Sequence, residues 1–126
     1  MSTILCVDDN PGNLCLVSTL FEMEGYNVLS TSDPRNALDL AKSTFFELAV
    51  LDYDLPHING AELARELKRI QPDVPIILFS GSLSITAEEL TVIDEHVCKG
   101  ETSGTLLLAA SCLLKPRTRA RACGKT

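Results

Sequence analysis

A chain of 126 residues with 45% hydrophobic and 22% charged side chains has the size and composition of one globular domain. No apolar run approaches the ~20 residues that a membrane-spanning helix needs. The N-terminus, MSTILCVDD, lacks the basic start of a signal peptide. We therefore expect a cytoplasmic protein without a membrane segment.

The charge is distributed unevenly along the chain. The formal net charge is −6, but the last twelve residues contain five basic side chains and no acidic one. The first 114 residues therefore carry six basic against seventeen acidic side chains, a net charge of −11. A domain this acidic is not typical of nucleic-acid-binding proteins. Its net charge indicates that part of the negative charge is gathered to bind a cation.

Five short apolar runs predict β-strands. The runs cover residues 3–7, 26–30, 46–51, 75–80 and 95–99. Most of them are nearly continuous rather than alternating, which indicates strands buried on both faces. The five cysteines include no C-x-x-C pair and are odd in number, which argues against a zinc site or a disulfide framework.

Helical patterns lie between the apolar runs. They cover residues 13–24, 33–43, 59–70 and about 102–114, with a fourth, weak helix between the last two. Asp33 before Pro34, and the capping-box pair Asn59 and Glu62, mark two helix starts. The fourth helix is weak because few residues follow its capping box at 86–89.

The alternation of strands and helices predicts an α/β domain with a parallel sheet and right-handed crossovers. We expect this domain to cover residues 1–115. Pro116 should end the last helix, because its ring cannot continue a helical backbone without strain. Residues 116–126 have no periodic pattern and predict a basic, flexible C-terminal tail.

Polar side chains stand at the ends of four predicted strands. Asp8 and Asp9 follow the first strand and Asp52 follows the third. Ser80 closes the fourth strand and Lys99 closes the fifth. Binding sites of open parallel sheets lie outside the carboxyl ends of the strands. We therefore expect three carboxylates, a hydroxyl and an ammonium group to meet at one edge of the sheet.

This set of groups has a specific chemistry. Three clustered carboxylates need a cation, and a ligand set made only of oxygens favours Mg²⁺, with Mn²⁺ as a substitute. Mg²⁺ held by a few carboxylates keeps positions open for phosphate oxygens. Ser80 can donate a hydrogen bond to a phosphoryl oxygen, and Lys99 can neutralise its charge. A carboxylate can itself attack phosphorus, which gives an aspartyl phosphate.

At these residues the chain resembles the receiver domain of the response regulators of two-component signalling. The resemblance covers residues 2–114 and rests on VDDN after the first strand, LDYDLPHINGAEL after the third, LFSGS at the fourth and VCK at the fifth. It implies a flavodoxin-like fold, a doubly wound five-stranded parallel sheet in the order 2-1-3-4-5 with five helices. It also implies a phosphoacceptor signalling domain of a phosphorelay rather than an enzyme.

The resemblance assigns roles to the acidic residues. Asp52 is the phosphoacceptor, which takes a phosphoryl group from a sensor histidine kinase or a histidine phosphotransfer protein in a Mg²⁺-dependent reaction. Asp9, Asp52 and the backbone carbonyl of Asp54 bind Mg²⁺, and Asp8 acts largely through water. A conformational switch then signals to a downstream protein target.

The resemblance also assigns roles to residues of the fourth and fifth strands. Ser80 and Lys99 receive the phosphoryl oxygens, and Ser80 then moves inward and shifts the fourth helix and fifth strand. His96 stands where the family has its switch aromatic; either its rotation depends on protonation, or it is an edge histidine without a signalling role. Gly100 replaces the proline that usually follows Lys99, which predicts a trans peptide bond or a more mobile loop.

Three alternatives remain beside this interpretation. A pseudo-receiver would bind partners as a scaffold without being phosphorylated. A phosphatase of the haloacid-dehalogenase type is disfavoured because LDYDLP has Pro56 at a key position and follows the wrong strand. The basic tail could touch nucleic acid or an anionic surface. We expect no DNA-binding domain, no membrane contact, and a monomer or weak dimer.

Overall fold

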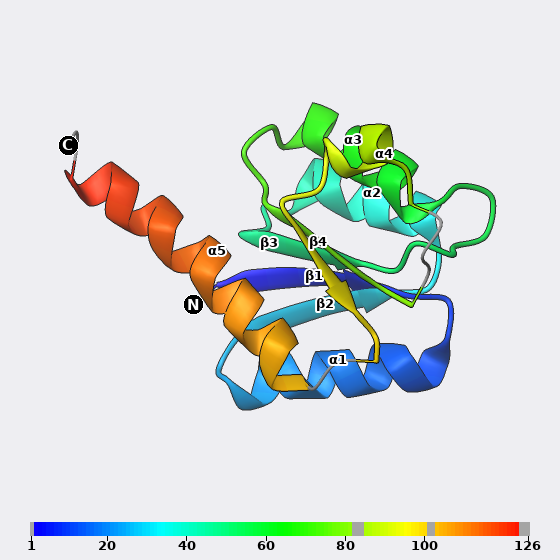
Figure 1. Cartoon of the computed structure of the whole chain (residues 1–126), viewed down its shortest axis with the longest axis horizontal. Helices are drawn as coiled ribbons and strands as arrows, with labels where there is room; N and C mark the ends of the chain where they lie inside the picture. The colour runs from blue at the N-terminus through cyan, green and yellow to red at the C-terminus, as the bar shows by residue number, and fades with distance from the viewer. Residues whose placement is uncertain (1, 82–84, 101–102, 124–126) are drawn as a thin grey trace.

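Five strands alternate with five helices along the chain in the computed structural model, which describes residues 2–81, 85–100 and 103–123 (Figure 1). The strands are β1 (Thr3–Val7), β2 (Asn27–Thr31), β3 (Leu48–Leu51), β4 (Ile76–Ser80) and β5 (Glu95–Cys98). The helices are α1 (Pro11–Met23), α2 (Pro34–Ser43), α3 (Gly60–Ile70), α4 (Ala87–Leu90) and α5 (Ser103–Cys123). The predicted α/β architecture is confirmed.

The strands form one parallel sheet in the order β2-β1-β3-β4-β5, as predicted. The central strands β1, β3 and β4 are buried along almost their whole length, whereas the edge strands β2 and β5 are partly exposed. The strand order reverses between the neighbours β1 and β3. A ligand site of a doubly wound sheet forms at the carboxyl ends of such a pair.

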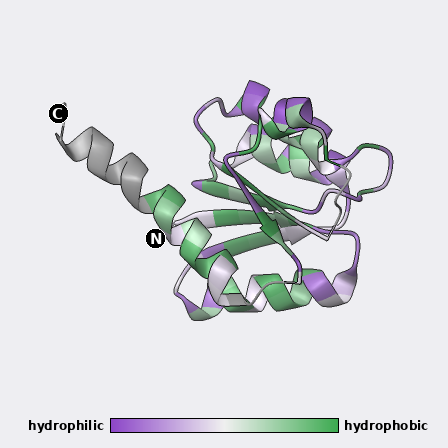
Figure 2. Cartoon of the chain, in the orientation of Figure 1, coloured by the Kyte–Doolittle hydropathy of each residue, from purple (hydrophilic) through white to green (hydrophobic). Residues whose placement is uncertain are grey.

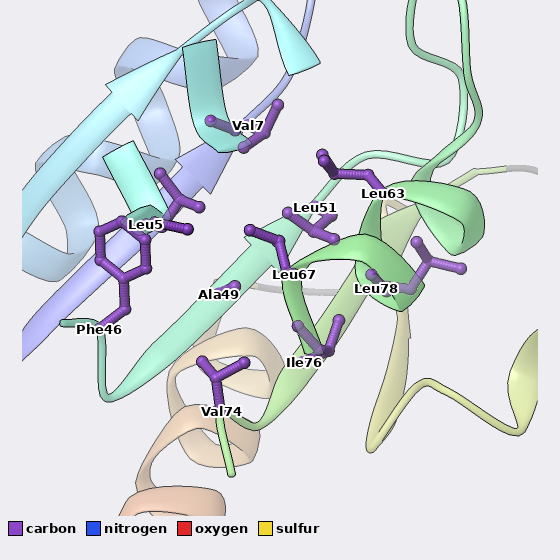
Figure 3. Close-up of a cluster of buried hydrophobic side chains, with 13 residues drawn as sticks. Leu5, Val7, Phe46, Ala49, Leu51, Leu63, Leu67, Val74, Ile76 and Leu78 are labelled. Carbon is purple, nitrogen blue, oxygen red and sulfur yellow. The ribbon is translucent and has the colours of Figure 1, made fainter. Parts of the chain in front are cut away.

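Alternating side chains divide the core into two halves. Leu5 and Val7 of β1 point to the face that α2, α3 and α4 cover, and Ile4 and Cys6 point to the face that α1 and α5 cover (Figure 1). Figure 3 shows the first half, in which leucines of α3 lie over β3 and β4. Figure 2 shows the hydrophobic residues concentrated in the sheet between the helices. Burial on both faces explains the continuous apolar runs of the sequence.

Local capping signals place the helix starts. Asp33 and Asn59 are the N-caps of α2 and α3, and Asn59 forms a complete capping box with Glu62. Asn10 caps α1, and its side chain accepts a hydrogen bond from the backbone N–H of Asn13. The prediction of a weak fourth helix is confirmed, since α4 has only four residues.

The last helix is longer than predicted. The expectation that it ends before Pro116 is wrong, because α5 continues to Cys123 and extends away from the sheet (Figure 1). The residues after the proline are mainly alanine and arginine, which favour a helical backbone. No helix in the described part of the chain, α5 included, is long and apolar enough to cross a membrane. The boundary at residue 115 stays a prediction, and residues 124–126 lie outside the described residues.

Gly60 lets α3 begin directly against the end of β3. Its backbone N–H donates a hydrogen bond to the carbonyl of Tyr53 (2.8 Å). A Cβ atom at this position would overlap the carbonyl oxygen of Asp52 and lie 2.9 Å from Cδ1 of Leu78. Only glycine therefore allows this approach, which holds the β3–α3 loop close to the carboxyl edge of the sheet.

Gln71, the C-cap of α3, joins three backbone groups at the opposite end of the domain. Its amide nitrogen donates to the carbonyls of Ala41 (2.9 Å) and Thr44 (2.7 Å). Its amide oxygen accepts from the backbone N–H of Phe46 (3.0 Å). One side chain thus provides hydrogen-bond partners for backbone groups at the end of α2 and in the segment that leads into β3.

The overlap at Gly60 predicts that Gly60→Ala lowers the free energy of unfolding by about 1–3 kcal/mol, because the added methyl group must displace backbone. Urea denaturation measures this loss. Gly100→Ala is the matched control, since nothing lies within 4 Å of its added Cβ. We expect the control to stay within about 0.5 kcal/mol of the wild type. Equal stability of the two variants would show that α3 does not depend on this contact.

The triple contact of Gln71 predicts that Gln71→Leu lowers the free energy of unfolding by about 1–3 kcal/mol, because polar backbone groups lose their partners. The exposed Arg65 lies on the same helix, and Arg65→Leu serves as the control. Thermal and urea denaturation of both variants provide the comparison. A Gln71→Leu protein that unfolds at the wild-type midpoint would contradict the structural role of this amide.

Candidate functional site

The sheet brings the predicted polar residues to one edge. Asp8 and Asp9 follow β1, Asp52 follows β3, Ser80 ends β4 and Lys99 follows β5. Asp8 and Asp52 are each 5% exposed and Ser80 is fully buried, whereas Asp9 is exposed. The site is therefore a partly buried acidic cluster with one open side at Asp9.

Asp8 is held by groups on both sides of its carboxylate. The backbone N–H of Asn10 donates to Oδ1 (2.9 Å), and the Lys99 ammonium donates to Oδ2 (3.0 Å). The backbone N–H of Asp8 donates to the carbonyl of Thr31 (3.3 Å), which continues the backbone hydrogen bonds between β1 and β2. The turn that begins α1 thus fixes the carboxylate at the edge of the sheet.

Lys99 lies between two of the carboxylates. Its Nζ atom is 3.0 Å from Oδ2 of Asp8 and 3.3 Å from Oδ1 of Asp52. Burial opposes the charged form of the lysine, but the hydrogen bond to Asp8 and the charges of Asp52 and Asp8 outweigh this effect and raise its pKa. Lys99 is therefore charged at neutral pH. No cis peptide bond occurs among the described residues, so the bond between Lys99 and Gly100 is trans.

The surroundings of Asp52 disfavour its ionised form, even though the ammonium group of Lys99 lies beside it. Burial of its carboxyl group and the charge of Asp8 raise its pKa to about 6, and Lys99 offsets only part of this shift. The carboxyl group is thus mainly ionised at pH 7. Its backbone N–H donates to the carbonyl of Val7 (2.9 Å), which fixes Asp52 beside Asp8.

The acidic residues fit a divalent cation. One carboxylate oxygen from each of Asp8, Asp9 and Asp52 lies within 4.8 Å of the others. Three carboxylates face one ammonium group, so the cluster keeps a negative excess that a cation would neutralise. Ligands that are all oxygen suit Mg²⁺ or Mn²⁺ rather than zinc. Asp54, whose backbone carbonyl is the fourth predicted ligand, follows in the β3–α3 loop with an exposed side chain.

The two predicted switch residues lie on neighbouring strands. Ser80 is fully buried at the end of β4, and its carbonyl accepts a hydrogen bond from the N–H of Lys99 (3.3 Å). His96 of β5 pairs with Leu78 of β4 and is half-buried. Its Nε2 atom is buried and has no hydrogen-bond partner among the described residues. The switch roles of both side chains stay predictions.

The structure adds residues that the sequence did not reveal as parts of the site. The hydroxyl of Tyr53, the residue after Asp52, donates to the carboxylate of Glu89 on α4. Glu89 was recognisable only as part of a capping box, because 36 residues separate it from Tyr53. Gly60 was visible in the sequence as a glycine at a helix start, but its contact with Asp52 depends on the three-dimensional approach of α3.

Comparison with solved structures supports the fold. The response regulator TrrA of Thermotoga maritima, solved in complex with Mg²⁺–BeF, is 30% identical, with a TM-score of 0.85 over 90% of this chain and 100% of that chain. A CheY-like receiver domain protein of Methanospirillum hungatei is 25% identical, with a TM-score of 0.87 over 94% of this chain and 98% of that chain. TrrA is also solved in complex with the histidine kinase ThkA, where it matches with a TM-score of 0.82.

Comparison of sequences leads to the same family. The response regulator SaeR of Staphylococcus aureus is 32% identical over an alignment of 120 residues, and the match covers 90% of this chain and 51% of SaeR. The chain thus spans about half the length of the curated relatives it matches. The family model of the response regulator receiver domain matches residues 4–99. From its fold, its acidic edge and these matches, the chain belongs to the response regulator receiver domain family.

Proposed function

We propose that this domain accepts a phosphoryl group from a histidine kinase or a histidine phosphotransfer protein onto Asp52, in a Mg²⁺-dependent reaction. The observation that carries the proposal is the position of the Asp52 carboxylate, which lies beside those of Asp8 and Asp9 and 3.3 Å from the Lys99 ammonium group at the open edge of the sheet. Receiver domains are signalling domains, and the phosphorylated form would signal to a downstream protein.

Each residue of the site has a separate role in the proposed phosphoryl transfer. An ionised oxygen of Asp52 attacks phosphorus, and the new O–P bond forms as the P–N bond to the donor histidine breaks. The electron pair of the broken bond stays on the histidine nitrogen. Lys99 is placed to neutralise an incoming phosphoryl oxygen, because its charged Nζ is already 3.3 Å from Asp52. Ser80 is the predicted hydrogen-bond donor to another oxygen.

Asp8, Asp9, Asp52 and the backbone carbonyl of Asp54 are the proposed residues that hold the cation. Mg²⁺ bound there would neutralise the negative charge of the phosphoryl oxygens. The position of one oxygen from each of these three aspartates within 4.8 Å of the others supports this proposal. The complex of the related protein TrrA with Mg²⁺–BeF is consistent with the same class of ligand.

A complex formed by a related protein supports the class of the proposed donor. TrrA is solved with the kinase ThkA, and we propose a partner of the same class for this chain. A cytoplasmic location and a monomer or weak dimer stay predictions from the sequence.

The proposed function predicts that acetyl phosphate with Mg²⁺ adds one phosphoryl group to the wild-type protein, because small phosphodonors present the same electrophilic phosphorus. Intact-protein mass spectrometry detects the adduct. Asp52→Asn should abolish it, and chelation of the metal by EDTA should prevent it. Asp39→Asn, an exposed change on α2, should leave it intact.

Two outcomes would contradict the proposed reaction. An Asp52→Asn protein that is labelled as well as the wild type would remove Asp52 as the acceptor. A wild-type protein that stays unlabelled, under conditions that label another receiver domain, would favour the scaffold role of a pseudo-receiver.

The cation site predicts that Mg²⁺ raises the midpoint of thermal unfolding, since a ligand at 100 times its Kd adds about 2.7 kcal/mol of stability. Asp9→Asn should weaken Mg²⁺ binding about tenfold or more, which is about 1.4 kcal/mol. Asp54→Asn should bind as the wild type does, because only its backbone carbonyl is a proposed ligand. Calorimetric titration with MgCl₂ separates the variants. Equal affinities for wild type and Asp9→Asn would contradict the assigned ligand set.

A further inference from the structure

The carboxylate of Glu89 on α4 collects hydrogen bonds from two distant segments. Within its own turn, it accepts from the N–H of Thr86 (3.0 Å) and from the Thr86 hydroxyl (3.3 Å). From the β3–α3 loop, it accepts from the hydroxyl of Tyr53 (3.0 and 2.9 Å to its two oxygens) and from Nδ2 of Asn59 (3.1 Å). One side chain of α4 is therefore bonded to both ends of the loop next to the acceptor.

Both loop partners of Glu89 are directly connected to Asp52. Tyr53 is the next residue along the chain, and its carbonyl accepts the N–H of Gly60 (2.8 Å). Asn59 is the N-cap of α3, whose first residue packs on the carbonyl of Asp52. A shift of the Asp52 backbone would therefore move both donors that reach Glu89.

The contact joins neutral donors to an ionised acceptor. The N–H of Thr86 and then the hydroxyl of Tyr53 lower the pKa of Glu89, so its carboxyl group stays ionised. Hydrogen bonds between a neutral donor and an ionised acceptor are stronger than those between neutral groups.

The small size of α4 makes it dependent on such anchors. A helix of four residues is unstable in isolation, because it is shorter than the length at which helices in water become stable. None of its residues is buried. Its apolar attachment comes from flanking residues, Ile85 before it and Val92 and Ile93 after it, which pack against the core of the α2–α3 face. The bonds of Glu89 thus attach α4 to the β3–α3 loop.

We propose that Glu89 is a positioning residue that couples the acceptor loop to α4 through Tyr53 and Asn59. This inference rests on the proposed function, because it concerns the structural response to a phosphoryl group on Asp52. The coupling runs through the β3–α3 loop and uses neither Ser80 nor His96. Since coupling between two sites is reciprocal, a partner that holds α4 would also change the affinity of the acceptor loop for its ligands.

The test compares the backbone amide NMR signals of residues 87–90 before and after addition of beryllofluoride with Mg²⁺. In the wild type, we expect signals next to Asp52 and signals of α4 to shift together. Tyr53→Phe removes only the phenolic hydroxyl and leaves the capping box of α4 intact. In this variant the signals next to Asp52 should still shift, while the shifts of α4 fall below about half of their wild-type size.

Two further variants sharpen the comparison. Glu89→Ala should lose the response of α4 as Tyr53→Phe does, and Glu89→Gln, which keeps one acceptor oxygen, should restore part of it. Glu88→Gln removes the neighbouring exposed carboxylate, which no hydrogen bond joins to Tyr53 within the described residues, and should respond as the wild type does.

The outcomes separate this inference from the proposed function. Undiminished shifts of α4 in both Tyr53→Phe and Glu89→Ala would overturn the coupling and leave the phosphoacceptor role intact. A wild-type protein whose signals shift next to Asp52 but not in α4 would also overturn the coupling and leave the phosphoacceptor role intact. A wild type without any shift next to Asp52 would overturn the proposed function, and the coupling with it.

Discussion

The excess of negative charge at the carboxyl edge of the sheet is the constraint on which the rest of this structure depends. Asp8 and Asp52 are almost fully buried, Asp9 stands beside them, and Lys99 is the one ammonium group within bonding distance of the buried pair in the described part of the chain. A buried charge is costly unless it is paired and hydrogen-bonded. The backbone N–H of Asn10 and the ammonium of Lys99 supply these partners, and an added cation would complete the compensation.

Much of the fold and of this edge was predictable, because the signals are local. A buried parallel strand is a short apolar run, and the polar residue that ends it marks the carboxyl edge, as Asp52 and Ser80 do. Contacts that depend on how distant segments approach were not predictable. The bond between Tyr53 and Glu89 needs the packing of α4 beside the β3–α3 loop. The extension of α5 beyond Pro116 was not predicted, because the helix-forming residues after the proline outweigh its tendency to end a helix.

The departures from the family pattern lie on one side of the site. The half formed by β1 and β3 keeps the acidic residues and the glycine that packs on Asp52. The half formed by β4 and β5 has His96 where the family has its switch aromatic and Gly100 where the family has proline. The helix that follows β4, α4, has only four residues. The residue types that the proposed phosphoryl site needs are thus present, while the elements proposed to transmit its presence differ from the family pattern. The attachment of α4 through Glu89 offers a transmission route that suits a short helix.

We propose above all that the acidic edge holds a cation beside a phosphoryl group on Asp52. A crystal structure of the protein with Mg²⁺ and beryllofluoride tests it most directly. We expect beryllium on a carboxylate oxygen of Asp52, fluorine atoms in contact with Ser80 and Lys99, and Mg²⁺ bound by Asp9 and Asp52. Crystals grown in saturating concentrations of both ligands that leave Asp52 paired with Lys99, as in the free protein, would contradict this claim.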